Sequence, residues 1–260
     1  MHIIITGGHS GIGLELSKQL LAEGHKIGLI VRSEQRKQAA ITAFEDSSQI
    51  DFFIADLSKR EHIQQVIEKI TIDWPHIDVL FNNAGYLADK LRFSDHGIEL
   101  QLEINAISPY LLTKGLLPLL RKAENPTVVS TATTGLHRKK AINIPAFRQP
   151  KKFTKLTGSY LDSKLVMVLL MNYLSKENES IRFVHVDPGP IKTKMTAGDG
   201  MPFWLKPLRN VLFKSPKEGA ANLYKGAFSE KINGSGIYLS GGKAKALQLS
   251  LYENEVQQLL

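Results

Sequence analysis

Thr6-Gly-Gly-His-Ser-Gly-Ile-Gly13, near the start of the chain, is the stretch that decides the fold. It follows a short apolar run at residues 2–6 and opens residues 10–23, whose apolar side chains recur at helical spacing. A strand that ends in glycines and leads at once into a helix is typical of nucleotide-binding α/β proteins. The spacing, Gly-x-x-x-Gly-x-Gly, differs from the general Gly-x-Gly-x-x-Gly fingerprint.

Each of three glycines in this turn has a physical reason to be there. Gly7 permits a tight turn, Gly11 lets the backbone approach a pyrophosphate, and Gly13 lets the helix pack on the strand. Free N–H groups at the helix start would hold the phosphate charge. The alternative is a glycine-rich turn that binds nothing.

Strands and helices alternate along the rest of the chain. The pattern predicts strands at residues 2–6, 26–31, 50–55, 77–82, 127–132, 181–186 and 236–240, and helices at 10–23, 34–45, 59–72, 95–122 and 158–177. Strands that are apolar throughout and joined by helices indicate a parallel sheet covered on both faces. We therefore expect an α/β fold: one Rossmann-type domain over residues 1–260, with a doubly wound parallel sheet of about seven strands.

Two segments interrupt this rhythm, residues 136–157 after the fifth strand and residues 189–216 after the sixth. Both leave from carboxyl ends of strands, where open α/β sheets bind ligands, so we assign them to the rim of a substrate site. The first carries seven cations and no acidic residue. It could attract an anionic substrate, assist cofactor phosphates or simply be solvated.

The composition limits the classes of function. The chain has 260 residues, a net charge of +8 and no cysteine, which excludes a disulfide framework and a thiolate metal site, and we expect no metal. No run of 18 apolar residues occurs, and the first strand begins at His2, so we expect a cytoplasmic protein. Nucleic-acid binding is not expected, because the basic segment has few aromatic residues for stacking.

Tyr160 and Lys164 lie four residues apart, at the head of the most apolar helical stretch. At this spacing the phenol and the ammonium share one helix face. A nearby cation favours phenolate over phenol, so the pair can serve as an acid/base device. A surface tyrosine beside a lysine is the alternative.

Five motifs together resemble the short-chain dehydrogenase/reductase family over about residues 2–240. They are Thr6-Gly-x-x-x-Gly-Ile-Gly13, Asn82-Asn-Ala-Gly85, Asn105, Tyr160-x-x-x-Lys164 and Pro188-Gly189. Within the family, the run from Leu91 to Leu100, Asn105, and the Tyr110-Leu-Leu-Thr run look like the retinol dehydrogenase and protochlorophyllide reductase branch.

The resemblance implies a catalytic set. Tyr160 would exchange a proton with the substrate oxygen, Lys164 would lower the pKa of Tyr160 and bond the nicotinamide ribose, and Asn105 would complete a proton relay. The family's usual serine after the fifth strand is replaced by a threonine. Counting from Asn105 gives Thr133, which we choose, and counting back from His137 gives Thr134.

The resemblance also implies a cofactor site. Arg32 follows the second strand where an acidic residue would accept the ribose 2′-hydroxyl, so NADP(H) is expected, with NAD(H) as the alternative. A solvated arginine would carry no such meaning. The expected cofactor-binding residues are Gly7, Ser10, Gly11, Ile12, Gly13, Arg32, Asp56, Leu57, Asn83, Ala84, Gly85, Tyr160, Lys164, Pro188, Gly189 and Thr193.

Residues 201–214 place apolar side chains beside cations, and in the family this region is a lid over the substrate. The apolar face predicts a lipophilic carbonyl or alcohol as substrate. A helix on a membrane surface and simple packing are the alternatives. The helix from Tyr160 is apolar nearly all round, which favours a homodimer or homotetramer. We predict an NADP(H)-dependent oxidoreductase, and a dinucleotide-sensing or membrane-docked regulatory protein as the alternative.

Overall fold

A computed structural model describes residues 1–44, 48–202, 204 and 209–260 of the chain. These residues form one sheet of eight strands in the order β3-β2-β1-β4-β5-β6-β7-β8. The strands are β1 His2–Thr6, β2 Lys26–Val31, β3 Ile50–Ile54, β4 Val79–Asn82, β5 Thr127–Thr131, β6 Arg182–Val186, β7 Ile237–Ser240 and β8 Lys243–Lys245. The first seven pair in parallel, which confirms the predicted Rossmann-type sheet.

The eighth strand was not predicted. β8 is three residues long, fully exposed and antiparallel to β7. Two of its residues are lysines, so no apolar run distinguishes it from a turn.

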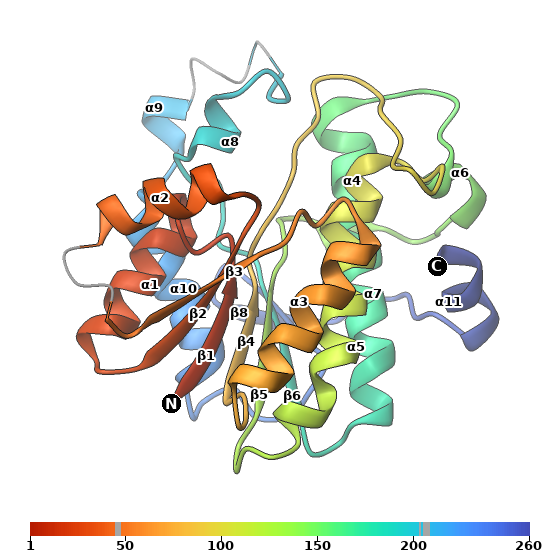
Figure 1. The fold of residues 1–260 in the computed structure, drawn as a ribbon. Helices are drawn as coiled ribbons and strands as arrows, with labels where there is room; N and C mark the ends of the chain where they lie inside the picture. The colour runs from red at the N-terminus through yellow and green to blue at the C-terminus, as the bar shows by residue number, and fades with distance from the viewer. Residues whose placement is uncertain (45–47, 203, 205–208) are drawn as a thin grey trace.

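Helices cover both faces of the sheet (Figure 1). One apolar core lies between the sheet and α1, α2 and α10, and the other lies between the sheet and α3, α5, α7 and α11. Their bounds are α1 Gly11–Ala22, α2 Glu34–Ala43, α3 Arg60–Asp73, α5 Ser108–Leu120, α7 Leu161–Glu177, α10 Pro216–Phe228 and α11 Glu253–Leu259. Short helices α4 Leu100–Leu102, α6 Ile144–Arg148, α8 Lys194–Ala197 and α9 Arg209–Leu212 join them, with η2 Leu136–Arg138.

The long helix predicted at 95–122 begins later and is not uniform. Residues 95–99 form a turn, in which Gly97 has a φ of +68°, and the Glu99 side chain accepts the Leu102 N–H to start α4. A π-helical turn, η1 Glu103–Ile107, then separates α4 from α5. A second π-helical turn, η3 Lys155–Tyr160, leads into α7.

Helix α10 was missed because its residues follow a proline-rich segment. A capping box starts it: the Ser215 side chain accepts the Glu218 N–H, and the Glu218 carboxylate accepts the Ser215 N–H. Gly226 lets α10 lie close on the sheet, because a Cβ there would stand 2.5 Å from a methyl carbon of Val186.

The apolar side chains of α7 are already buried in the single chain. Leu165, Val166, Val168, Leu169 and Leu170 are at most 1% exposed. The single chain therefore already buries the apolar faces of α7 that led us to expect a homo-oligomer, and the oligomer stays a prediction. None of the helices in the described part of the chain has the length and hydrophobicity to span a bilayer.

Candidate active site

A cleft of about 580 Å³ lies at the carboxyl ends of the central strands. It lies where β1 and β4 are neighbours. The strand order reverses direction at this point, and open α/β sheets bind ligands at such a topological switch point. Most of the expected site residues line it: Gly7, Ser10, Gly11, Ile12, Gly13, Arg32, Asp56, Leu57, Asn83, Ala84, Gly85, Tyr160, Lys164 and Thr193.

The glycine turn forms the floor of this cleft. Gly7 and Gly11 have φ values of +67° and +54°, which L side chains rarely adopt. A Cβ at Gly13 would lie 2.4 Å from the Gly7 carbonyl oxygen, so only glycine allows this close packing. Ser10 is the residue before α1, and its side chain makes no capping hydrogen bond to the first N–H groups of that helix. These groups are free to hold an anion.

Thr6 and the turn after β4 hold the cleft together. The Thr6 hydroxyl accepts hydrogen bonds from the N–H groups of Asn83 (3.0 Å) and Ala84 (2.9 Å). The Asn83 amide donates to the Thr6 carbonyl at 3.1 Å. The Asn-Asn-Ala-Gly turn therefore has a structural role, while Asn83, Ala84 and Gly85 also face the cleft.

Asp56 and Leu57 form the wall after β3. The Asp56 carboxylate accepts the Ser58 N–H at 3.0 Å and its hydroxyl at 2.7 Å, which fixes this turn. The His62 ring accepts the Asp56 N–H at 3.3 Å.

Tyr160 ends η3 and Lys164 lies one turn into α7, as the spacing predicted. Both are buried, with exposed fractions of 7% and 2%, yet both line the cleft. The Lys164 ammonium donates to the Thr131 carbonyl at 2.8 Å. The lysine is thus held against the end of β5.

Of the two candidate threonines, the structure places Thr133 against Tyr160, through a side-chain hydrogen bond. The Thr134 hydroxyl instead donates to the Asp187 carboxylate at 3.1 Å. The Tyr238 hydroxyl donates to the Thr133 carbonyl at 2.7 Å and holds the loop in this position.

The pKa of Tyr160 differs from the expectation that Lys164 lowers it. Burial, with a smaller effect of the Asp187 carboxylate, raises the pKa of Tyr160 to about 12, and the Thr133 hydrogen bond lowers it by less. Burial lowers the pKa of Lys164 to about 8. Loss of solvent penalises both charged forms, and here it outweighs their proximity.

Asn105 lies behind the cleft rather than on its surface. It is fully buried in η1, where its side chain accepts the Tyr86 N–H at 2.7 Å and donates to the Tyr86 carbonyl at 2.9 Å. It also donates to the Ser163 hydroxyl at 3.0 Å. A Cβ at Gly85 would lie 3.8 Å from the Asn105 side-chain oxygen and 3.7 Å from the Lys164 nitrogen, so these two polar atoms approach the same point.

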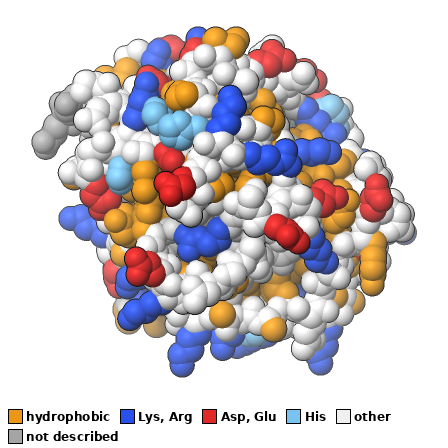
Figure 2. All heavy atoms as spheres, turned by 90° about the horizontal axis from the view of Figure 1, so that it is seen from below, with side chains coloured by type: hydrophobic (Ala, Val, Ile, Leu, Met, Phe, Trp, Pro, Cys, Tyr) orange, Lys and Arg blue, Asp and Glu red, His pale blue; other side chains and the backbone are white. Residues whose placement is uncertain are grey.

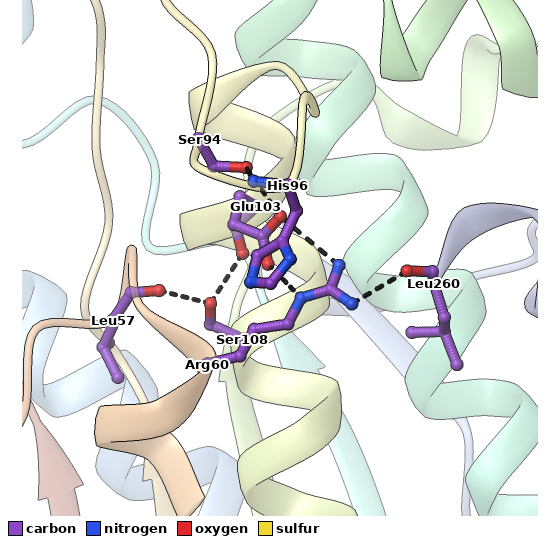
Figure 3. A network of polar contacts seen from close by, with 7 residues as sticks. All are labelled: Leu57, Arg60, Ser94, His96, Glu103, Ser108 and Leu260. Atoms are coloured by element: carbon purple, nitrogen blue, oxygen red, sulfur yellow. Dashed lines mark hydrogen bonds and ion pairs between the residues drawn. The ribbon is translucent and has the colours of Figure 1, made fainter.

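A buried ion pair supports η1 from below (Figure 3). The Glu103 carboxylate is fully buried and accepts hydrogen bonds from Arg60 at 2.9 Å and from Ser94 at 3.1 Å. The Ser108 hydroxyl is bonded to the carbonyls of both Glu103 and Leu57. Arg60 also donates to the Leu260 carbonyl at 2.9 Å, so the network joins η1, a cleft wall and the end of α11.

Among the cleft residues that were not predicted, four carry basic or imidazole side chains: His9, Arg36, Arg92 and Lys194. Burial lowers the pKa of His9, and the cations of Arg36, Arg32 and Lys194 lower it further. Three cations thus gather around one imidazole at the end of the cleft where β2 stops. These residues come from different parts of the chain, so no sequence pattern marks them as a group. His9 alone could have been marked as a candidate, because it lies within the glycine turn.

The segment after β6 contributes only in part. The structure brings Thr193 to the cleft, whereas Pro188 and Gly189 are not among the residues that line it. The Gly189 N–H is held by the Asp187 carboxylate at 2.8 Å. A Cβ at Gly11 would lie 3.2 Å from the Thr193 methyl group, so Thr193 stands directly over the phosphate turn.

An apolar cluster surrounds the Tyr160 ring. Leu87, Met201 and Phe213 are its other buried members, and Leu156 and Met195 pack against it. They come from the β4–α4 loop and from the two segments predicted to form the rim. Phe203 and residues 205–208 of the expected lid lie outside the described residues.

The residues present fit a dinucleotide. The uncapped N–H groups of α1 suit a pyrophosphate, the cations at one end suit a further phosphate, and the Tyr160–Lys164 pair stands at the other.

Comparison with known proteins gives a family. A model of the short chain dehydrogenase family matches residues 1–200. The chain is 27% identical to a polyprenol dehydrogenase of Danio rerio, and the alignment covers 99% of this chain and 83% of the relative. It is 28% identical to retinol dehydrogenase 11 of Mus musculus, over 95% of this chain and 78% of the relative.

Solved structures agree with the fold. A short-chain dehydrogenase of Shigella flexneri, solved as a complex with NADP, has a TM-score of 0.71 and 25% identity, and covers 91% of this chain and 95% of its own. Salutaridine reductase from Papaver somniferum has a TM-score of 0.70 at 19% identity, over 91% of this chain and 98% of its own.

Proposed function

The chain belongs to the short-chain dehydrogenase family, in its retinol dehydrogenase-like branch, and from that premise we propose an NADP(H)-dependent reaction. The enzyme interconverts a carbonyl and an alcohol of a lipophilic small molecule. One observation carries this proposal: a single cleft is lined by Tyr160 and Lys164 and also by a group of cations.

A bound nicotinamide cofactor would supply or accept the hydride. The protein's part is to hold the proton. With its pKa raised to about 12, Tyr160 is protonated at neutral pH and is ready to donate to a carbonyl oxygen. The neighbouring Lys164 charge stabilises the phenolate that remains, and Thr133 offers it a hydrogen bond.

Asn105 acts through other groups. Its side chain ties Tyr86, which lines the cleft, to Ser163, and the Ser163 hydroxyl donates to the Tyr160 carbonyl at 2.8 Å. We assign Asn105 to holding η1 and the head of α7 in register, with its side-chain oxygen and the Lys164 ammonium both near Gly85.

The preference for NADP(H) rests on the end of β2. Arg32 and Arg36 are exposed there beside His9 and Lys194, and Asp56 is the acidic residue of the cleft that follows β3 rather than β2. A 2′-phosphate adds charge that these cations would pair with, whereas a ribose hydroxyl would leave them unsatisfied.

The lipophilic substrate rests on the apolar cluster around Tyr160. Leu87, Met201 and Phe213 bury apolar surface against the reactive ring, which suits a substrate with a hydrocarbon part. Because Met201 and Phe213 pack there, these two residues of the expected lid serve the site more directly than they serve a membrane surface. Trp204, Val211 and Leu212 remain exposed.

The test is carbonyl-dependent oxidation of NADPH, followed by absorbance over a panel of aldehydes, ketones and alcohols with both cofactors. Tyr160→Phe should lower kcat about 10²–10⁴-fold, because it removes the proton donor. NADPH binding, measured by fluorescence, should be unchanged. Tyr252→Phe, at a 70% exposed tyrosine, is the matched control. Turnover near wild type in Tyr160→Phe would overturn the assignment.

A further inference from the structure

Two histidines and an aspartate lie together at the opposite edge of the sheet from the cleft. Among the described residues, His2, His76 and Asp78 are the one group of three whose candidate ligand atoms all lie within 4.8 Å of one another. His2 begins β1, and the other two stand between α3 and β4. Figure 2 looks at this side of the molecule and shows histidine side chains gathered beside acidic ones.

The three side chains converge because β1 pairs with β4. Ile3 is the strand partner of Val79, so His2 and Asp78 precede paired positions. The His2 backbone N–H donates to the Asp78 carboxylate at 2.7 Å, and the same oxygen lies 3.3 Å from the His76 Nε2 atom. A ligating carboxylate held by such a hydrogen bond is already oriented.

The two imidazoles are also held in place. The His2 ring packs edge-on against the His76 ring, with centroids 4.5 Å apart, and against the Trp74 ring at 5.2 Å. Two cations act on His2: the N-terminal ammonium and Lys26, which is paired with the Asp51 carboxylate at 2.9 Å. Because the Lys26 charge is already paired with a carboxylate, it repels a metal ion bound among the three side chains less than a free lysine would.

We propose that His2, His76 and Asp78 form a binding site for a divalent transition-metal ion of the Zn²⁺ type. Around a tetrahedral ion with bonds of about 2.0–2.1 Å, ligand atoms stand about 3.3 Å apart. The observed His76–Asp78 separation has this value, and a ring nitrogen of His2 lies within 4.8 Å of both of these ligand atoms. Imidazole ligands select transition metals over Mg²⁺ and Ca²⁺.

The three ligand side chains are all partly exposed, so an ion can reach the site and water can complete the ion's coordination. It ties the first strand to the α3–β4 connection. The cleft lies at the carboxyl ends of the strands and this group at their amino ends, so the ion stabilises the fold and takes no part in the hydride reaction.

The experiment uses the full chain without an affinity tag. Zn²⁺ is titrated calorimetrically, and we expect saturation at one ion per chain and a rise in Tm. His76→Ala and Asp78→Asn should each weaken binding by about tenfold or more and abolish the Tm rise, because each removes a ligand. The Asp78→Asn amide oxygen still accepts the His2 N–H, so this variant keeps the local fold.

Two histidines outside the group are matched controls. His96→Ala removes an exposed histidine elsewhere, and His25→Ala removes one that lies near Glu23 at the start of β2. Both should bind Zn²⁺ as wild type does. NADPH-dependent activity should be unchanged in all four variants.

Trp74 supplies an independent signal. In a Trp204→Phe background it is the remaining tryptophan, and Cu²⁺ bound beside His2 should quench its fluorescence. The quenching should disappear in His76→Ala. Equal Zn²⁺ binding by wild type, His76→Ala and Asp78→Asn, or loss of binding in either control, would overturn the site.

Discussion

We expect two buried titratable residues to set the pH range of the proposed reaction. Burial lowers the pKa of Lys164 to about 8 and raises that of Tyr160 to about 12. Below pH 8 the lysine is charged and the tyrosine holds its proton, which is the pair that reduction needs. As the pH rises through about 8, the lysine becomes neutral and the phenolate left by proton transfer loses its stabilising charge. We expect kcat/KM for reduction to fall above pH 8, about tenfold per unit.

The control for this pH profile is Lys164→Arg. A guanidinium keeps its charge above pH 12, so the falling limb should move up by several pH units even if the absolute rate drops. A limb that stays at pH 8 in this variant would mean that another group titrates.

Arg32 provides the sharpest test of cofactor choice. Arg32→Asp removes a charge-assisted contact to a 2′-phosphate and offers an acceptor to a ribose hydroxyl, so KM for NADPH should rise about 10–100-fold while KM for NADH falls. Steady-state kinetics with both cofactors measure this. Lys231→Asp, an equal charge reversal at an exposed position outside the cleft, should leave the ratio unchanged. An unchanged ratio in Arg32→Asp would contradict the NADP(H) assignment.

Among the single residues of the candidate site, the sequence predicts those that belong to local motifs. The glycines, Tyr160 and Lys164 are found because one turn or one helix carries each set. Counting from Asn105 chose Thr133 over Thr134, but only the structure shows that the loop turns the Thr133 hydroxyl to Tyr160 and the Thr134 hydroxyl to Asp187.

Helical element η1 depends on the pair of Arg60 and Glu103. The carboxylate is fully buried, while the arginine side chain is 24% exposed. Arg60→Met would leave a buried charge without its partner, which costs about 3–5 kcal/mol. We expect that loss in the free energy of unfolding, measured with urea, together with a lower kcat because η1 carries Asn105.

A double variant serves as control for this element. Replacing both partners, Arg60→Met with Glu103→Leu, removes the buried charge as well and should recover most of the stability. If the single variant costs less than about 1 kcal/mol, comparable to an exposed pair, the ion pair does not support η1.

The π-helical turns could not be predicted from the spacing of apolar residues. Apolar spacing through residues 100–120 is that of an ordinary helix, so the sequence predicts the element but not the extra residue in its turn. The deviation depends on contacts from elsewhere: the Ser108 hydroxyl bonds the Leu57 carbonyl, and Asn105 bonds Tyr86.

For the whole molecule, a parallel sheet follows from the alternation of strand and helix, which is why the fold class and seven of the eight strands were predicted, whereas the order of the strands in the sheet comes from the structure. Groups assembled from distant segments were not predicted either. The His9 cation group joins three segments, and His2 lies 74 residues before His76 in the chain, so no spacing in the sequence marks either. The oligomeric state and the cytoplasmic location stay predictions.

The charge of the whole molecule makes one last prediction. The net charge of +8 attracts an anionic cofactor, and Arg32, Arg36, Arg92 and Lys194 concentrate that field at the cleft. The screening length falls from about 10 Å at 0.1 M salt to about 3 Å at 1 M, so KM for NADPH should rise steeply with NaCl. NADH lacks the 2′-phosphate and should respond less. Arg32→Asp should flatten the NADPH response toward that of NADH. Equal salt dependence for both cofactors in the wild type would mean that the cations at the end of β2 do not face the extra phosphate.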